Sequence, residues 1–267
     1  MISSRDNRIL KATRRLRRSK GGREDDGVLL EGPHLVQTAL ECGTALEVLL
    51  VEAGQRETFA ALLERAGSLG VEVREVEPAL LREGSDVDSP RGLLALASVQ
   101  RPDLAELKRR AVAGRVLYLD AVQDPGNVGA LIRSAAASGC AAVVAAPGSC
   151  SWRNPRAVRA SAGAALRLPL LWGAAPEQLR ELVGDTAPWL TLAAHGGTPL
   201  WSATLPPAGV LVVGSEAHGV SAAANRLATH RLTIPLVAGV ESLNAAVAAS
   251  VVLFEWRRRG PSDALPD

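Results

Sequence analysis

One stretch near the end of the chain decides the fold: Ile234-Pro-Leu-Val-Ala-Gly-Val-Glu-Ser-Leu-Asn-Ala-Ala-Val-Ala-Ala-Ser-Val-Val-Leu-Phe-Glu-Trp256. A short strand is expected to end at Pro235, and an apolar helix to begin after Gly239. Ser242 and Asn244 then fall in the first turn of this helix, where backbone N–H groups lack helical partners and can bind a ligand. The simpler interpretation is that Glu241 and Ser242 only cap the helix.

The composition predicts a folded protein without a membrane span. The chain has 267 residues, 47% of them hydrophobic, which suffices for one large domain or two ordinary ones. The longest apolar run, residues 243–254, is shorter than the roughly 18–20 residues that cross a bilayer. No apolar segment follows the basic first residues, so no secretory signal is predicted. We therefore expect a cytoplasmic protein.

The cysteines and histidines do not form a recognisable site. The three cysteines are an odd number without Cys-x-x-Cys spacing, and the four histidines stand apart from them. This pattern predicts neither a disulfide framework nor a zinc site, and we expect no metal.

Positive charge gathers at the start of the chain, although the formal net charge is only +2. Nine lysines and arginines between residues 5 and 23 face a single acid, Asp6. Such a cluster attracts polyphosphate, but a solvated helix face would have the same composition. Because only 3% of the residues are aromatic, any RNA contact should use phosphates, 2′-hydroxyls and shape. The candidate contacts are Arg14, Arg15, Arg17 and Arg18.

Strand and helix patterns alternate through the first hundred residues. We expect strands over residues 28–30, 46–51, 71–76 and 93–99, and helices over 8–19, 33–42 and 57–66. The polar segment 85–92 is typical of a loop that could face a substrate. Residues 1–99 therefore predict a small α/β domain, and residues 100–114 predict a linker that can be partly helical.

A second α/β series begins at Arg115. We expect strands over residues 116–119, 141–145, 168–171, 190–194, 210–213 and 232–236, and helices over 127–138, 155–162 and 243–256. Because helical segments separate the strands, a parallel sheet with helices on both faces is predicted, with functional loops at the carboxyl ends of the strands. This domain should cover residues 115–259, and residues 260–267 should form a tail.

The spacing of the glycines can be compared with two nucleotide-binding motifs. Gly214 and Gly219 have P-loop spacing, but Val220 stands where a P-loop needs its lysine. Residues 124–129 hold glycines three apart without the leading pair of a Rossmann motif. Neither motif is therefore present.

Three other segments follow one another in a single domain. They are Asp120-x-x-x-Asp124-Pro-x-Asn127-x-Gly129-Ala-x-Ile-Arg133-Ser134-Ala135, Val213-Gly-Ser-Glu216-x-His-Gly219 and Ile234-Pro-x-x-Gly-x-x-Glu241-Ser242-Leu243-Asn244. In this order they resemble the three motifs of the SpoU (TrmH) family, which are S-adenosylmethionine-dependent RNA ribose 2′-O-methyltransferases. Residues 1–99 resemble more loosely the ribosomal-protein-like substrate-binding domain of many members, through Glu31-Gly32 and Pro90-x-Gly92.

The resemblance implies a fold that periodicity could not reveal. In this family the C-terminal segments pass through a loop to form a deep trefoil knot, although knots are almost absent from proteins. The helix after Gly239 would be the knotted tail and also the dimerisation helix. We therefore expect an α/β protein: a small RNA-binding domain followed by a knotted methyltransferase domain with a parallel sheet.

The resemblance also assigns residues to the site. It places S-adenosylmethionine against Gly214, Ile234 and Leu243, and makes Arg133 the essential arginine, reaching from one chain to the cofactor of the other. For Ile234 and Leu243 the plain alternative is core packing, because apolar residues are usually buried.

Methyl transfer to a ribose hydroxyl is an in-line displacement, so it depends mainly on alignment. The pKa of a guanidinium is above about 12, so Arg133 stays protonated at neutral pH. We therefore expect it to act as a positive charge rather than as a base. It would bind the phosphate beside the target ribose and stabilise the developing alkoxide. The side chains expected to orient the ribose and the arginine are those of Asn127, Glu216, Ser242 and Asn244. Glu216 would be explained equally well as a neighbour of a helix N-terminus.

The last helix predicts a homodimer. Apolar side chains recur at helical spacing while alanines keep the other faces small, so too few polar positions remain for an exposed side. The recurring residues are Leu243, Val247, Val251 and Phe254. A two-fold helix contact would cover the second face. The alternative is a helix buried wholly within one domain.

We therefore expect a methyltransferase that modifies ribose in RNA, with 23S ribosomal RNA as the favoured substrate. Transfer RNA and a self-protecting antibiotic-resistance role stay open as alternatives within the enzyme class. A non-catalytic RNA-binding protein on the same fold is the alternative outside it. The joint presence of Asn127, Arg133, Glu216, Ser242 and Asn244 favours the enzyme, because an RNA-binding module would not need them.

Overall fold

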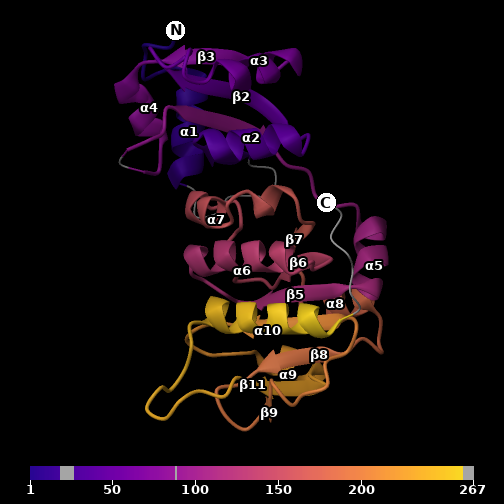
Figure 1. Ribbon diagram of the computed structural model, residues 1–267. Coiled ribbons are helices and arrows are strands. Elements are labelled where there is room, and N and C mark those ends of the chain that lie inside the picture. The colour runs from indigo at the N-terminus through magenta and orange to yellow at the C-terminus, as the bar shows by residue number, and fades with distance from the viewer. Residues whose placement is uncertain (19–26, 88, 261–267) are drawn as a thin grey trace. The chain divides into compact units, whose positions relative to one another are not determined.

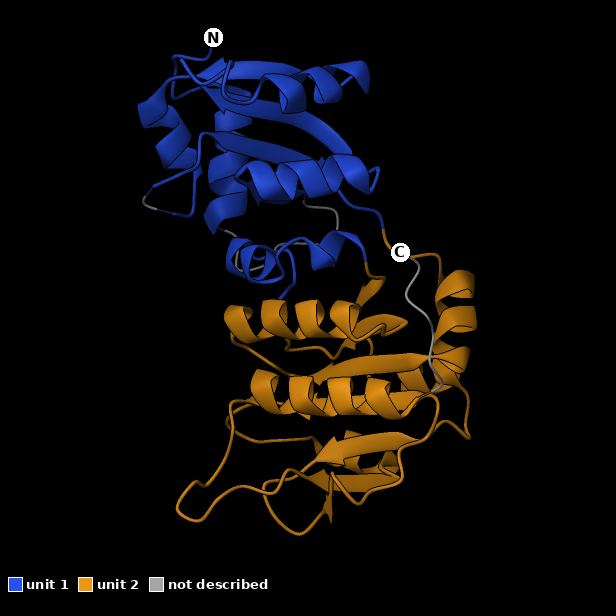
Figure 2. Ribbon diagram, in the orientation of Figure 1, with its two compact units in different colours: residues 1–100, 151–167 blue, residues 101–150, 168–267 orange. Residues whose placement is uncertain are grey.

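The computed structural model describes residues 1–18, 27–87 and 89–260, and Figure 1 shows its helices and strands. Contacts divide the chain into two compact units (Figure 2). Unit 1 consists of Met1–Gln100 and Ser151–Arg167, and unit 2 of Arg101–Cys150 and Leu168–Asp267. No helix of the described residues is long and apolar enough to cross a membrane.

Unit 1 is built on a four-stranded mixed sheet in the order β1-β4-β2-β3. Its elements are α1 (Arg8–Arg18), β1 (Val28–Glu31), α2 (Pro33–Glu41), β2 (Ala45–Glu52), α3 (Ala60–Ser68), β3 (Val73–Val76), α4 (Pro78–Gly84), β4 (Leu93–Ser98) and α7 (Pro155–Ala160). Strand β4 pairs antiparallel with β1 and β2, while β3 pairs parallel with β2. The small α/β domain expected at the N-terminus is therefore present.

The N-terminal helix α1 is held by its apolar face. Leu10 and Leu16 pack into a core with side chains of the sheet and of α4, such as Leu50 and Leu81. Thr13, which is buried between them, satisfies its hydroxyl on the backbone carbonyl of Leu10. Burial of this face leaves most of the basic residues on the opposite side.

Residues 151–167 belong to unit 1, whereas the sequence interpretation included them in a domain of residues 115–259. Helix α7 packs against β1. Arg159 pairs with Glu31, and Arg167 pairs with Glu41 of α2. These contacts join residues more than a hundred positions apart, which strand and helix periodicity cannot reveal.

Unit 2 contains a seven-stranded sheet in the order β7-β6-β5-β10-β8-β11-β9. The strands are β5 (Arg115–Asp120), β6 (Ala142–Ala145), β7 (Leu170–Trp172), β8 (Trp189–Leu192), β9 (Thr198–Pro199), β10 (Gly209–Gly214) and β11 (His230–Thr233). Every pair is parallel, as the alternating pattern predicts. The strand ends therefore gather at one edge, which positions the site.

Helices cover both faces of this sheet. They are α5 (Leu104–Ala113), α6 (Pro125–Ala137), α8 (Pro176–Val183), α9 (Ala222–Leu227) and α10 (Ala245–Arg259). Helices α6 and α10 pack against each other, as Figure 1 shows. Residues of α5, α8 and α9 share a core with Tyr118 and Trp189, whose rings meet edge to face at 5.9 Å. Burial raises the pKa of Tyr118, and its hydroxyl donates to the carbonyl of Ala174.

Several elements differ from the expected ones. The expected linker 100–114 contains α5, which Asp103 caps by accepting from the N–H of Ala105 and which packs against α8. Strand β11 ends at Thr233, before Pro235. The short helices α4, α8 and α9 were not predicted. The expected tail lies outside the described residues except for Gly260.

Candidate functional site

A cavity of about 170 Å³ lies at the carboxyl ends of β8, β10 and β11. Its wall comes from four segments: the end of β8 with the residues after it, the loop after β10, the segment after β11, and the start of α10. The lining residues are Leu192, Ala193, Ala194, Val213, Gly214, Gly219, Val220, Ile234, Leu236, Ser242, Leu243, Ala245 and Ala248. No charged side chain is among them, so the cavity suits an uncharged, mainly apolar part of a ligand.

The loop after β10 requires glycine at two positions. A Cβ on Gly214 would collide with the backbone carbonyl carbon of Gly219. Gly219 itself has φ +67°, in the left-handed region that favours glycine. Backbone hydrogen bonds between Ser215 and Gly219 in both directions close the loop. The wall of the cavity is therefore bare backbone at this point.

A buried carboxylate holds this loop in place. Asp120 lies opposite Gly214 in the pairing of β5 with β10, and its side chain accepts a 2.6 Å hydrogen bond from the N–H of Ser221. Ser221 in turn caps α9 by accepting from the N–H of Ala224. Asp120 thus links the end of β5 to α9, the helix that follows the loop after β10.

The three residues expected to contact the cofactor line one cavity. Gly214 comes from the β10 loop, Ile234 from the segment after β11, and Leu243 from the turn before α10. Ile234 and Leu243 are only partly buried, and they face the cavity, so core packing alone does not explain them. Ser242 lies beside them and is exposed.

Three of the predicted polar residues form a chain of hydrogen bonds. Asn127 donates through Nδ2 to Glu216 Oε1 at 2.5 Å and accepts at Oδ1 from Asn244 Nδ2 at 3.0 Å. Asp124 fixes the start of α6 by accepting from the N–H of Asn127 at 2.8 Å. Residues 89 and 117 positions apart therefore meet at the rim of the sheet.

The start of α10 differs from the sequence interpretation. Asn244 is the N-cap, and its Oδ1 accepts from the N–H groups of Ala246 and Val247 at 2.9 and 3.2 Å. Ser242 therefore precedes the helix, so the expectation that it lies in the first helical turn was wrong, and so was the alternative that Glu241 and Ser242 cap the helix. Because the cap already uses these N–H groups, they are not free to bind a ligand.

Arg133 does not join the network within one chain. It is exposed on α6, and no hydrogen bond or ion pair links it to Asn127, Glu216, Ser242 or Asn244 in the described part of the chain. Its neighbour Ser134 shares a 2.7 Å hydrogen bond with Ser250 of α10. The guanidinium thus stays in solvent while the helix that carries it is anchored.

The four arginines proposed as RNA contacts fall into two pairs. Arg14 is part-buried, donates to the carbonyl of Leu10 and pairs with Glu83 at 3.5 Å, and Arg17 donates to the carbonyl of Glu83. Arg15 and Arg18 are exposed. The first pair therefore has a role in holding α1. Lys20 and Arg23 of the same cluster lie outside the described residues.

The cavity fits part of S-adenosylmethionine. Apolar side chains and bare glycine backbone offer flat surfaces for an adenine ring, and the absence of lining charges suits a neutral nucleoside. Its volume is below the roughly 300–1,000 Å³ of most ligand pockets, so it would enclose only part of the cofactor. The wall at Leu192–Ala194 was not predicted, although its place after a parallel strand is a usable signal. No group of His, Cys, Asp and Glu side chains in the described residues could hold a metal.

Two family models match the chain, one on each side of residues 96–113. The SpoU rRNA Methylase family matches residues 114–254, which contain the cavity and the hydrogen-bonded network. The MRM3-like substrate binding domain matches residues 7–95, within unit 1.

Similar proteins extend over nearly the whole chain. An uncharacterised tRNA/rRNA methyltransferase of Synechocystis is 30% identical, and the match covers 97% of this chain and 93% of the relative. A 23S rRNA guanosine 2′-O-methyltransferase of Bacillus subtilis is 29% identical over 96% and 98% of the two chains. The crystal structure of an AdoMet-bound rRNA methyltransferase from Sinorhizobium meliloti superposes with a TM-score of 0.82 at 25% identity, covering 96% of this chain and 97% of that one.

Proposed function

The chain belongs to the SpoU rRNA methylase family and is an S-adenosylmethionine-dependent RNA 2′-O-methyltransferase, and we propose that its substrate is 23S ribosomal RNA. The observation that carries the proposal is the convergence of the three motifs. Gly214, Ile234 and Leu243 line one cavity, and the chain Glu216–Asn127–Asn244 lies at the same edge of the sheet. The relative from Bacillus subtilis, matched over its whole length, acts by its name on 23S rRNA.

The residues of the chain mainly align the reactants. S-adenosylmethionine, when bound, supplies the electrophilic methyl group, and Ile234 and Leu243 would hold its adenosine part. Asn127 is held at both ends of its amide, so Glu216 is fixed in one position. The second oxygen of Glu216 makes no hydrogen bond in the described residues, and we assign it to the ribose hydroxyl. Such alignment can account for a large part of the rate enhancement.

Arg133 would supply positive charge to this site from the partner subunit of a homodimer. Two observations support a dimer with shared sites. Arg133 has no bond to the polar network of its own chain, and apolar side chains of α10 are open to solvent: Val247 and Phe254 are each 49% exposed. A second copy of the helix would cover them, as apolar helix faces require.

Mixing two inactive variants tests the shared site. Arg133→Ala removes the charge, and Leu243→Arg fills the cofactor cavity. Heterodimers of the two would contain one intact site, so activity should return after subunit exchange. No recovery after verified exchange, or a monomer by light scattering, would refute the shared site.

Mapping ribose methylation in RNA from cells with and without the gene tests the substrate. A single lost 2′-O-methyl group in 23S rRNA is expected. Loss in transfer RNA would move the activity to that substrate, and loss coupled to drug sensitivity would indicate a resistance enzyme. Failure to bind S-adenosylmethionine by calorimetry at micromolar concentration would favour a non-catalytic RNA-binding protein.

The remaining family properties are proposals as well. We propose a trefoil-knotted path, which the interleaved strand order β5-β10-β8-β11 and the contribution of both late loops to one cavity support. We propose a cytoplasmic location, which agrees with the bacterial 23S rRNA methyltransferase among the similar proteins. We propose RNA contacts by the basic face of α1, through Arg15 and Arg18 in particular.

A further inference from the structure

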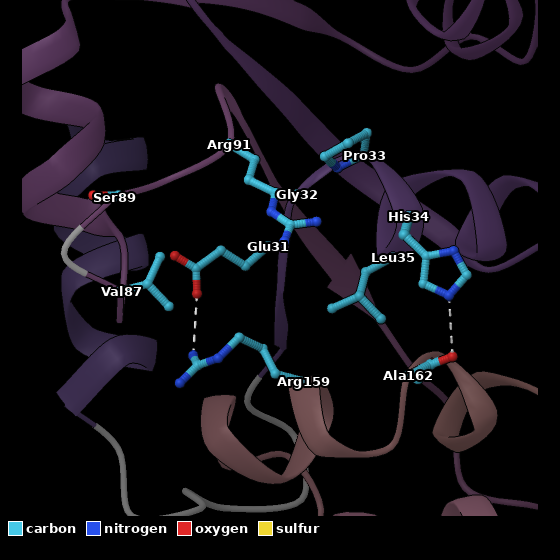
Figure 3. Close-up of a pocket in the computed structure, with 10 residues that line it drawn as sticks. All are labelled: Glu31, Gly32, Pro33, His34, Leu35, Val87, Ser89, Arg91, Arg159 and Ala162. Carbon is cyan, nitrogen blue, oxygen red and sulfur yellow. Dashed lines mark hydrogen bonds and ion pairs between the residues drawn. The ribbon is translucent and has the colours of Figure 1, made fainter.

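Unit 1 contains a second cavity, of about 390 Å³, which the methyl-transfer chemistry does not use. Figure 3 shows its walls: the end of β1 with the start of α2, the residues Val87, Ser89 and Arg91, and the end of α7 with Ala162. Its volume lies within the roughly 300–1,000 Å³ of small-ligand pockets. It is therefore large enough to take a single nucleotide.

A charged cluster fixes the three walls relative to one another. The side chain of Glu31, 5% exposed, pairs with Arg159 at 3.1 Å and accepts hydrogen bonds from Ser85 and from the N–H of Asp86. Arg159 also pairs with Asp86 at 2.8 Å. Desolvation makes a buried ion pair weak support for stability, so its main effect here is to hold the walls in one arrangement.

The α7 wall is also strained. Ala162 has φ +48°, a left-handed conformation that is unfavourable for any residue with a Cβ, and its carbonyl oxygen lies 3.3 Å from His34 Nε2. Strained residues persist where surrounding structure imposes them, and they gather at ligand clamps. In Figure 3 the His34 ring reaches from α2 toward this carbonyl, and both residues line the cavity.

The lining points to a nucleotide as the ligand. Pro33, Leu35 and Val87 supply apolar surface, and the His34 ring supplies a plane on which an unstacked base can lie. Arg91 is exposed at the rim and makes no hydrogen bond or ion pair within the described residues. A guanidinium in this position suits a phosphate, which it binds with two parallel hydrogen bonds.

We propose that this cavity receives one unpaired nucleotide of the RNA substrate, with its base between the apolar wall and His34 and its phosphate on Arg91. The inference rests on the proposed function, because it takes RNA to be the substrate. It assigns unit 1 a specific contact that selects an unpaired, splayed-out nucleotide, in addition to the general attraction of the basic helix α1.

Two variants separate the base from the phosphate. Val87→Trp fills the cavity without changing charge, and Arg91→Ala removes the rim charge. Arg65→Ala, an exposed arginine on α3, is the matched control. Binding to in vitro transcribed 23S rRNA is measured against salt concentration, and the urea unfolding curve of each variant reports whether unit 1, which carries all three substitutions, is folded.

Val87→Trp should weaken RNA binding about tenfold, the scale of losing one stacked base, and leave the salt dependence unchanged. Arg91→Ala should also weaken RNA binding about tenfold. It should lower the slope of log affinity against log salt by about 0.7–0.9, the value expected for the loss of one phosphate contact. Arg65→Ala should do neither.

Loss of affinity in Arg91→Ala alone would overturn base insertion and leave a surface phosphate contact. Unchanged binding in both variants would overturn the site altogether. Methyl transfer from labelled S-adenosylmethionine to the same transcript is scored separately in the wild type. Absence of transfer with intact RNA binding would contradict the proposed function and not the nucleotide site.

Discussion

The two cavities of this protein are built in opposite ways. The cavity of unit 2 is formed by glycine backbone and apolar side chains at strand ends, and no charged residue lines it. The cavity of unit 1 is held open by ion pairs among Glu31, Asp86 and Arg159. The first site therefore depends on close backbone approach, and the second on charges that connect separate segments. In the cavity of unit 2, positive charge has to come from a residue outside the lining.

The largest effect is expected from removing the positive charge of Arg133, which lies outside the cavity. Arg133→Ala should lower turnover by about two orders of magnitude or more, the scale of losing one preorganised electrostatic group. S-adenosylmethionine affinity should stay nearly unchanged, because Arg133 does not line the cavity. Single-turnover kinetics test the rate, and calorimetry tests the affinity. A rate within about tenfold of the wild type would be inconsistent with a catalytic charge.

Blocking the close approach of the backbone at Gly214 should instead lower the affinity for the cofactor. In Gly214→Ala the new methyl group collides with the carbonyl of Gly219, so the loop has to move. Overpacking of this kind costs about 1–3 kcal/mol, so cofactor affinity should fall about ten- to a hundredfold. Gly67→Ala is the control, because Gly67 lies on α3 with open space around its Cβ position. Equal affinity in both variants would show that the loop is not part of the cofactor site.

Breaking the ion pairs of unit 1 tests the other mode of construction. Glu31→Ala leaves Arg159 without its buried partner and should destabilise unit 1 by about 2 kcal/mol, less than the roughly 3–5 kcal/mol of fully buried pairs because Arg159 is 30% exposed. Glu41→Ala removes the exposed pair with Arg167 and should change stability little. Urea unfolding of both variants gives the comparison. Equal stability of the two would mean that the Glu31 cluster does not hold the walls.

The arginines of α1 should contribute to RNA binding as a charged surface rather than as a specific site. Replacing Arg14, Arg15, Arg17 and Arg18 by Gln should weaken RNA binding and flatten its salt dependence, because phosphate contacts release counterions. Replacing only Arg15 and Arg18 should retain most of the effect, because both side chains are exposed, whereas Arg14 is part-buried and pairs with Glu83. An unchanged salt slope would identify the cluster as a solvated helix face.

The smallest effect concerns the end of α10 that lies away from the cavity. Arg258 and Arg259 lower the pKa of Glu255 to about 2, from its usual 4.5. A lowered pKa contributes stability above pH 4.5 that is lost as the pH falls toward 2. The melting temperature of Glu255→Gln should therefore lie below that of the wild type at neutral pH, and the difference should vanish near pH 2. A difference that is constant with pH would exclude the ionised carboxylate as its cause.

Local patterns predicted most of the secondary structure. Strands such as β5 and β10 carry continuous apolar runs, and α6 follows a proline and a capping aspartate, so their positions could be read directly. The start of α10 was harder, because Glu241, Ser242 and Asn244 are all polar or good caps. Only the backbone geometry showed that Asn244 caps the helix.

What the sequence determined by itself was the alternation of strands and helices, the parallel sheet, and the motif residues that contact the cavity. The strands, the helices and the parallel sheet follow from short-range periodicity, and the motif residues follow from the resemblance of three short segments to a known family. Tertiary structure alone decided that Asn127, Glu216 and Asn244 form one chain of hydrogen bonds. It also decided that residues 151–167 belong to unit 1, where Arg159 meets Glu31 across 128 positions. The physical reason is that such pairings depend on where the sheet brings strand ends and helices together, which no local pattern specifies.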